Sequence, residues 1–291
     1  MRPVQRPHAN TKKPKLIGPP GACDTHLHVY GPSAVYPLSA ERNYTPDPRS
    51  TLDYYLAVHR ALGLERAVIV TGSANGTNNQ VTLDALARMD GKFKGLALLD
   101  PAVTDAELRR FKDGGITGFR VKANGKGGLS YEDSKKMAAR MSGFGWHVEF
   151  MSQSTTEVIG AVPFLNSLKM PYVFDHVAHA EPHHGCDDDF HELLRILKDE
   201  DHAWINLYSF YQLSKTGSPH YADMIDVVRE IIETRPDRVI WGSNWPHAGI
   251  TVPMPNDGDL LDFLLSAAPE EHTRKLILAT NPAKLYGWPT I

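Results

Sequence analysis

The fold class is decided by residues 66–122, which read RAVIVTGSANGTNNQVTLDALARMDGKFKGLALLDPAVTDAELRRFKDGGITGFRVK. This stretch contains three short apolar runs of strand length, at 66–72, 93–100 and 116–122, separated by helical patterns over 79–89 and 104–112. Runs that are apolar at nearly every position are typical of parallel strands covered on both faces. The stretch therefore predicts strand–helix units around a parallel sheet.

The same alternation continues outward in both directions. Further strands are predicted at 21–30, 145–151, 171–177, 203–208 and 237–244, and further helices at 50–62, 188–199 and 221–234. Eight strands with intervening helices in under 300 residues fit an α/β fold of the (β/α)8 TIM-like barrel type. A doubly wound open sheet is the alternative. Polar residues at the ends of most strands favour the barrel, because barrel enzymes build their sites on that rim.

Composition excludes two broad classes of function. The chain has 291 residues, and its 31 Lys and Arg against 34 Asp and Glu give a net charge of −3, whereas a nucleic-acid-binding protein needs a basic stripe. No apolar run approaches the roughly 18 residues of a membrane span, and residues 1–16 lack the apolar stretch of a secretory signal. We therefore expect a cytoplasmic protein with no nucleic-acid or membrane partner. We expect an N-terminal arm over 1–20 and a single barrel domain over 21–291.

The sharpest signal for chemistry lies in the first predicted strand, at Asp24-Thr25-His26-Leu27-His28. Side chains two residues apart on a strand point to the same side, so His26 and His28 face one way. Two imidazoles at a strand end can bind a metal ion or polarise an oxygen jointly. This pair therefore predicts a functional site rather than a hydrogen-bonded core.

A later strand end supplies a third histidine. His176 closes the predicted strand PYVFDH. Three more histidines follow it in the next loop, at His179, His183 and His184. A His-rich loop is usually solvated surface, so we expect these three to lie outside the site.

The last predicted strand ends in WGSNWPH (241–247). A Gly-Ser pair that ends the strand and two tryptophans beside Pro and His are typical of a shaped pocket, although Trp241 and Trp245 can simply fill the core. Asn244 and His247 are the members of this motif with useful chemistry, and we expect both in the site.

These motifs, in this order, resemble the amidohydrolase superfamily, and within it the branch of 2-pyrone-4,6-dicarboxylate lactonase. The likeness runs from PPGACDTHLHVYGP to TNPAKLYGW and includes VIVTGSANGTNN, ALLDPAV, GGITGFRV and DRVIWGSNWPH. The ordered set is more specific than the HxH pair alone. The resemblance implies a distorted (β/α)8 barrel that works without a divalent metal or other cofactor. It also implies that His26, His28 and His176 hold and polarise a lactone carbonyl.

One departure from the family bears on the reaction. The last strand of the family normally ends in Asp, as in a TDWPH-type motif, whereas this chain has Asn244. An amide cannot take a proton from water at pH 7, and general-base assistance is worth roughly 10²–10⁴-fold. Either hydrolysis is impaired, or the reaction needs no activated water. A hydroxyl already in the substrate can open a lactone instead, because it is held beside the carbonyl at high effective molarity.

The cations of the expected site depart from the family as well. The lactonase presents several arginines to a dicarboxylate, and here Arg120 matches one while Lys126 and Gln212 fall where others would be. Fewer cations and more amides favour a sugar-acid lactone as the small-molecule substrate. Arg120 would clamp its carboxylate, with Lys126 in support unless that residue is simply a solvated lysine. Tyr44 and Ser73 match substrate contacts of the family.

Among the activities of the branch that these motifs resemble, the two departures fit a lactone isomerase best, and the resemblance then implies conversion of D-galactaro-1,5-lactone into the 1,4-lactone without a metal. His26, His28 and His176 would stabilise the negative charge that develops on the C1 carbonyl. The C4 hydroxyl of the substrate would attack and lose its proton to His176, while Asn244 orients it.

Three alternatives stay open. A metal-independent lactonase acting on a pyrone dicarboxylate or a muconolactone would need His176 or His247 to activate water. A metal-dependent decarboxylase or hydrolase would lack a carboxylate ligand where Asn244 stands. A non-catalytic binder of sugar acids would show ligand stabilisation without turnover.

Overall fold

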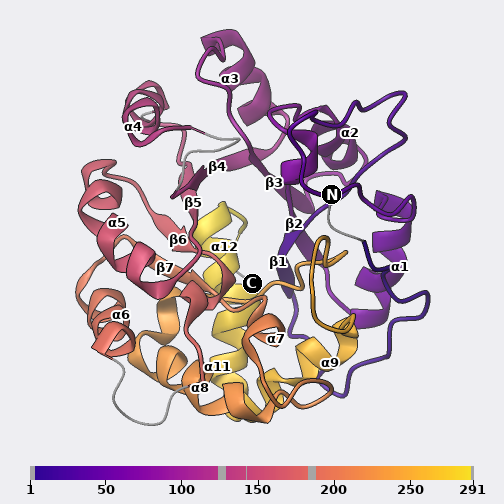
Figure 1. Cartoon of the computed structure of the whole chain (residues 1–291), viewed down its shortest axis with the longest axis vertical. Coiled ribbons are helices and arrows are strands. Elements are labelled where there is room, and N and C mark those ends of the chain that lie inside the picture. Colours follow the sequence, from indigo (N-terminus) through magenta and orange to yellow (C-terminus); the bar gives the residue numbers. More distant parts are fainter. Residues whose placement is uncertain (1–3, 124–128, 142, 183–187, 290–291) are drawn as a thin grey trace.

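Parallel strands alternate with helices around a nearly closed barrel in the computed structural model, which describes residues 4–123, 129–141, 143–182 and 188–289 (Figure 1). The strands are β1 (Cys23–Leu27), β2 (Arg66–Val70), β3 (Phe93–Ala97), β4 (Ile116–Lys122), β5 (His147–Met151), β6 (Tyr172–Phe174), β7 (Ala203–Asn206) and β8 (Val239–Ile240). Neighbours in the sheet follow the chain from β1 to β8, and each pair is parallel. The (β/α)8 prediction is confirmed, and the open doubly wound sheet is wrong.

Helices surround the strands on the outside (Figure 1). The α-helices are α1 (Leu52–Leu62), α2 (Gln80–Ala87), α3 (Asp105–Asp113), α4 (Tyr131–Arg140), α5 (Thr155–Ser167), α6 (Asp188–Asp199), α7 (Phe210–Leu213), α8 (Ile225–Thr234), α9 (Asp257–Asp262), α10 (Leu264–Ala267), α11 (Glu271–Lys275) and α12 (Asn281–Tyr286). Short 3-10 turns are η1 (Ser73–Asn75), η2 (His176–His179), η3 (Ala222–Met224) and η4 (Pro236–Arg238), and η5 (Leu276–Thr280) is π-helical. Local signals set several boundaries, as where Thr104 and Glu107 form a capping box before α3.

Six of the eight strands end earlier than their apolar runs predicted, and the difference bears on the site at β6 and β8. The run 171–177 contributes only β6, up to Phe174, and the run 237–244 contributes only β8, up to Ile240. Beyond these points the chain leaves the sheet, with left-handed backbone at His176 (φ 52°) and Asn244 (φ 62°). The polar ends of both motifs therefore lie in loops above the rim of the barrel, and not on strands.

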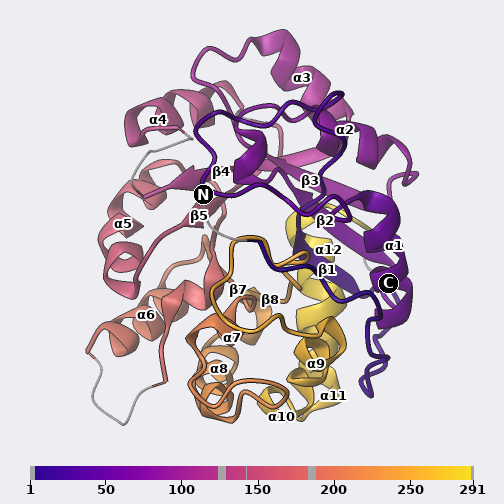
Figure 2. The ribbon, with the colours of Figure 1, turned by 45° about the vertical axis from the view of Figure 1, so that its right-hand side comes forward.

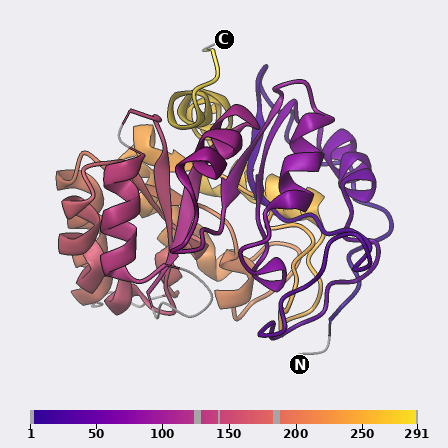
Figure 3. The same ribbon diagram turned by 90° about the horizontal axis from the view of Figure 1, so that it is seen from above.

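The barrel interior is filled by inward-facing apolar side chains. Val68, Val70, Leu96, Val173 and Ile240 form a fully buried cluster together with two residues of α12, Leu285 and Tyr286. Helix α12 thus covers one end of the barrel, and Figure 3 shows it on the opposite side of the molecule from the N-terminal segment. Burial of this apolar surface stabilises the barrel and leaves the other end for the loops.

The seam between β8 and β1 is closed by the two motifs themselves. Backbone hydrogen bonds run from Thr25 N to Trp241 O (3.0 Å), from Asn244 N to His26 O (2.8 Å) and from His28 N to Trp245 O (2.7 Å). Gly242 permits this approach, because an added Cβ would lie 2.7 Å from His26 Cβ and 2.8 Å from His26 N. The first and last motifs are therefore held side by side.

The N-terminal segment lies along the loop between β8 and α9 (Figure 2). Gln5 Nε2 donates to the carbonyl of Val252 at 2.6 Å, and the backbone nitrogen of Lys12 donates to Asn256 Oδ1 at 3.0 Å. These contacts order the described part of the segment predicted as an arm. Among the described residues, every helix is too short or too polar to cross a membrane.

Candidate active site

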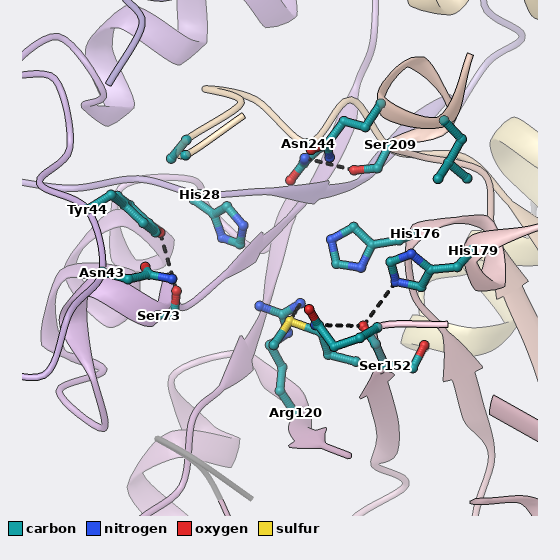
Figure 4. Close-up of a pocket in the computed structure, with 16 residues that line it drawn as sticks. His28, Asn43, Tyr44, Ser73, Arg120, Ser152, His176, His179, Ser209 and Asn244 are labelled. Atoms are coloured by element: carbon teal, nitrogen blue, oxygen red, sulfur yellow. Dashed lines mark hydrogen bonds between the residues drawn. The ribbon is translucent and has the colours of Figure 1, made fainter. Parts of the chain in front are cut away.

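A cavity of about 350 Å³ opens at the C-terminal ends of the strands, where barrel sites are built (Figure 4). Seven of the residues predicted from sequence line it: His28, Tyr44, Ser73, Arg120, His176, Gln212 and Asn244. They come from loops, a strand, 3-10 turns and the short helix α7, spread over most of the chain. The tertiary structure therefore brings together most of the expected set.

Two predicted residues lie elsewhere, and a third is not described by the structure. His26 and His247 are buried but do not line the cavity. His26 lies behind His28, with their Nε2 atoms 3.4 Å apart. Lys126 lies outside the described residues.

The HxH pair is held from both sides. His28 Nδ1 lies 2.8 Å from the carbonyl of Val70, and His26 Nδ1 lies 3.1 Å from Glu149 Oε2. The ring of His26 also stacks on Tyr208, with centroids 4.0 Å apart. Burial lowers the pKa of His26 to about 3 and lowers that of His28 well below its ordinary value, so both imidazoles are neutral at pH 7. A neutral imidazole donates from one nitrogen and accepts at the other.

His176 and His179 stand at the two ends of a left-handed turn. All four residues from His176 to His179 have positive φ, between 48° and 56°, a conformation that costs roughly 1–3 kcal/mol at each non-glycine residue. The turn brings the two imidazoles onto one side, with centroids 5.4 Å apart, and both line the cavity. His179 Nε2 lies 3.0 Å from the carbonyl of Ser152 (Figure 4). Such strain at successive residues is typical of functional sites, and it makes this turn a candidate for one.

The expectation that His179 lies outside the site is therefore wrong. In the sequence, the three-residue spacing in DHVAH was the signal that could have indicated a shared face for His176 and His179. Burial lowers the pKa of both histidines, and for His176 the neighbouring His179 lowers it further. His176 Nδ1 is buried without a hydrogen-bond partner among the described residues.

A buried ion cluster underlies the cavity. The Nε atom of Arg120 lies 2.8 Å from Glu149 Oε1, and its Nη2 lies 2.6 Å from Asp175 Oδ2. Burial raises the pKa of both carboxyl groups above the ordinary range, against the opposing effect of the guanidinium. Nη1 of Arg120 has no hydrogen bond among the described residues, so this edge is the part of the group available to a ligand.

Sequence reasoning missed Glu149 and Asp175. Glu149 lies within the apolar run HVEFM, and Asp175 ends the apolar run YVFD. A single acidic residue in such a run was the signal in the sequence that could have indicated them. Both are fully buried. Because Arg120 pairs with both carboxyl groups, less of its own charge is available to a substrate than the sequence suggested.

Asn244 presents its amide at the opposite wall. Its Nδ2 donates to Ser209 Oγ and to the Tyr211 hydroxyl, each at 3.0 Å, and Figure 4 shows the first of these bonds. None of the described residues that line the cavity is Asp or Glu. Among the described lining residues, the imidazoles are therefore the candidates for a base that faces a bound substrate.

One group of three metal-ligating side chains converges among the described residues. The donor atoms of His26, Glu149 and Asp175 lie within 4.8 Å of one another. Both carboxylates already pair with the buried guanidinium of Arg120, and a divalent ion would place its charge beside that cation. These three donor groups therefore do not fit a resident metal ion.

The barrel, the HxH pair at the end of β1 and the histidine after β6 define an amidohydrolase-type site. Residues 23–288 match the amidohydrolase family, and the chain belongs to this family. The resemblance identified from the motifs is thus confirmed.

Curated relatives cover nearly the whole chain. The chain is 37% identical to 4-sulfomuconolactone hydrolase of Rhizobium radiobacter over 98% of its length and 96% of the relative. It is 32% identical to a 2-pyrone-4,6-dicarboxylate hydrolase of Comamonas testosteroni, over 97% and 95% of the two chains. D-galactarolactone isomerase of Agrobacterium fabrum is 28% identical over 94% and 93%.

A solved structure has the same architecture. The apo crystal structure of Agrobacterium tumefaciens ATU3138 superposes with a TM-score of 0.83 at 25% identity. The match covers 96% of this chain and all of the other.

Proposed function

We propose that this protein catalyses acyl transfer at the carbonyl of a lactone that carries an acidic group. The observation that carries the proposal is the cavity itself, which has neutral imidazoles at His28, His176 and His179 and no acidic residue among its described lining. The lactone-acting relatives support the same class of substrate.

The residues divide the work between binding and proton transfer. The free edge of Arg120 would bind the acidic group of the substrate, and Tyr44 and Ser73, whose hydroxyl oxygens lie 3.4 Å apart, would hydrogen-bond its oxygens. His28 and His176 would lie beside the reacting carbonyl. His176 would take the proton of the nucleophile, and the ring oxygen that leaves the carbonyl would be protonated in turn.

The first candidate reaction is isomerisation. Here a hydroxyl of the substrate attacks its own lactone carbonyl, so the C–O bond to the old ring oxygen breaks as a new ring forms. The reaction needs no activated water, which suits an amide at position 244 and a cavity whose described lining holds no carboxylate. The conversion of D-galactaro-1,5-lactone to the 1,4-lactone is the specific reaction we propose.

The second candidate reaction is hydrolysis of an anionic lactone of the muconolactone or pyrone-dicarboxylate type. Identities of 37% and 32% to hydrolases of such lactones support it. His176, which lines the cavity, would then activate water. His247, the other base considered from sequence, does not line the cavity and is not proposed for this role.

Proton NMR of the products, combined with mass spectrometry of reactions run in ¹⁸O-labelled water, separates the two reactions. The chelator-treated protein is incubated with freshly prepared D-galactaro-1,5-lactone, with a muconolactone and with 2-pyrone-4,6-dicarboxylate. Isomerisation gives the 1,4-lactone before any free diacid and without ¹⁸O, whereas hydrolysis gives an open-chain acid with one ¹⁸O per bond cleaved. Absence of turnover of all three lactones, both by the wild-type protein and by the exposed-site control variant His220→Asn, would contradict the proposal.

A further inference from the structure

We propose that Tyr211, His247 and Asp257 form a positioning chain behind Asn244. The chain turns the amide oxygen of Asn244 toward the cavity, where it accepts a hydrogen bond from the attacking hydroxyl. This inference deepens the proposed acyl transfer and rests on it. It applies whether that hydroxyl belongs to water or to the substrate.

The chain is continuous and lies behind the cavity wall. Asp257 Oδ1 lies 2.9 Å from His247 Nε2, and His247 Nδ1 lies 2.9 Å from the Tyr211 hydroxyl. The same hydroxyl lies 3.0 Å from Asn244 Nδ2. Asp257, His247 and Tyr211 are each at most 3% exposed, and none of the three lines the cavity, whereas Asn244 does.

The direction of each hydrogen bond follows from the acid at the far end. In the chain that we propose, Asp257 Oδ1 accepts from His247, so the ring proton of His247 lies on Nε2. His247 Nδ1 then accepts, and the Tyr211 hydroxyl must donate to it. The Tyr211 oxygen can then only accept a second hydrogen bond, and the NH₂ group of Asn244 donates it.

The consequence for Asn244 is a fixed orientation of its amide. Its nitrogen is held by Tyr211 and by Ser209, so its oxygen points away from both. Figure 4 shows Asn244 with this nitrogen turned toward Ser209. An amide oxygen accepts a hydrogen bond from a hydroxyl, which orients an oxygen lone pair of that nucleophile toward the carbonyl. With the amide reversed, the NH₂ group would compete for the same lone pair.

The backbone at both motif residues of this hydrogen-bonded chain is left-handed. Asn244 and His247 both have left-handed backbone, with φ of 62° and 60°, and His247 N donates to the carbonyl of Asn244 at 2.8 Å. Asp257 lies in the first turn of α9. Such backbone is costly at residues other than glycine, and it is retained here at the two motif residues that the chain connects.

The test is a double-mutant cycle between positions 257 and 244. Asp257→Asn keeps the shape of the side chain but can donate to His247 Nε2, which permits the other tautomer and reverses every bond up to Asn244. We expect kcat to fall at least tenfold with KM within about twofold. Asn244→Asp offers oxygen in either orientation, so in that background the same Asp257→Asn change should lower kcat by less than twofold.

Two further variants separate positioning from folding. Tyr211→Phe breaks the chain at its centre and should lower kcat as Asp257→Asn does. Tyr221→Phe removes another buried hydroxyl next to Phe210, outside the chain, and should leave kcat unchanged. An equal loss from Asp257→Asn in both Asn244 and Asn244→Asp backgrounds would overturn the inference and indicate a merely structural role.

A readout without substrate keeps this test independent of the proposed function. In ¹⁵N-labelled protein, the side-chain NH₂ signal of Asn244 is assigned by its loss in Asn244→Asp. We expect its hydrogen exchange to accelerate at least tenfold in Asp257→Asn and Tyr211→Phe and to stay unchanged in Tyr221→Phe. Unchanged exchange in all three variants would contradict the positioning chain. Altered exchange without turnover of any lactone would support the positioning chain and contradict the proposed acyl transfer.

Discussion

The Nε2 atoms of His26 and His28 lie 3.4 Å apart inside the barrel. His28 Nδ1 donates to the carbonyl of Val70 at 2.8 Å, so Nε2 of this neutral ring accepts. His26 must then donate from Nε2 and accept at Nδ1, which lies 3.1 Å from Glu149 Oε2. This arrangement requires a proton on the carboxyl of Glu149, whose pKa is raised to about 7, chiefly by burial. The protonation of the buried Glu149 carboxyl therefore determines which ring nitrogens of His26 and His28 carry a proton.

Replacing Glu149 should change the pH profile. In the wild-type protein we expect kcat to fall as pH rises through about 7, because deprotonated Glu149 can no longer donate to His26. Glu149→Gln donates at every pH, so its profile should stay flat from pH 6 to 8, near the kcat of the wild-type protein with Glu149 protonated. Steady-state kinetics across this range check the prediction, with the exposed Glu271→Gln as control. A wild-type alkaline limb that persists in Glu149→Gln would contradict it.

His176 is the residue whose loss should reduce turnover most. Because His176→Asn removes the proposed base, we expect kcat to fall roughly 10²–10⁴-fold. Burial and His179 lower the pKa of His176 well below its ordinary value, so it stays neutral and the wild-type protein should keep its activity from pH 7 down to pH 6. Rate measurements on this variant and on the exposed-site variant His220→Asn make the comparison. Equal rates for the two variants would remove His176 from the mechanism.

The close approach of Gly242 to β1 should be measurable as stability. Gly242→Ala places a Cβ 2.7 Å from that of His26, so β1 or the loop after β8 must shift, and we expect a loss of about 1–3 kcal/mol. Gly160→Ala is the matched control, since an added Cβ in this exposed turn of α5 meets nothing within 4 Å; it should stabilise by roughly 0.5–1 kcal/mol. Urea unfolding of both variants decides the sign of each effect. A neutral Gly242→Ala would show that the seam is looser than its contacts indicate.

A histidine far from the cavity should make stability depend on pH. His147 is buried beside Tyr286, and burial lowers its pKa to about 3. Below its unfolded pKa of about 6.5 the unfolded chain takes up a proton that the folded protein does not, so folding becomes less favourable as pH falls, by about 2 kcal/mol at pH 5.

His147→Gln should remove this dependence. The melting temperature of the variant relative to wild type should rise as pH falls from 7 to 5, whatever their difference at pH 7. The exposed His202→Gln serves as the control and should show no such trend. A constant difference between His147→Gln and wild type across this range would mean that His147 does not resist protonation in the fold.

Periodicity and motif order were sufficient for the fold and for much of the cavity lining. Apolar runs such as 66–72 and 116–122 are local patterns, and eight of them with intervening helices predict a barrel without any long-range information. The position of His28, Arg120 and Asn244 near strand ends was enough to place them on one rim, because a barrel gathers the C-terminal ends of its strands.

Other features of the site depend on contacts between residues far apart in the chain. His26 meets Glu149 across 123 residues, and Arg120 pairs with Asp175 across 55. No local pattern indicates such partners, because they are chosen by the radial order of the strands and by the desolvation of charged groups in the interior.

Backbone conformation was equally invisible to the apolar pattern. The left-handed turn that places His179 beside His176 depends on strain that only the surrounding packing can hold. The sequence by itself therefore determined the barrel and most of the side chains on its rim. The tertiary structure decided which of them face the cavity, which are neutralised by buried partners and which way an amide points, because burial and hydrogen bonding are properties of the folded chain.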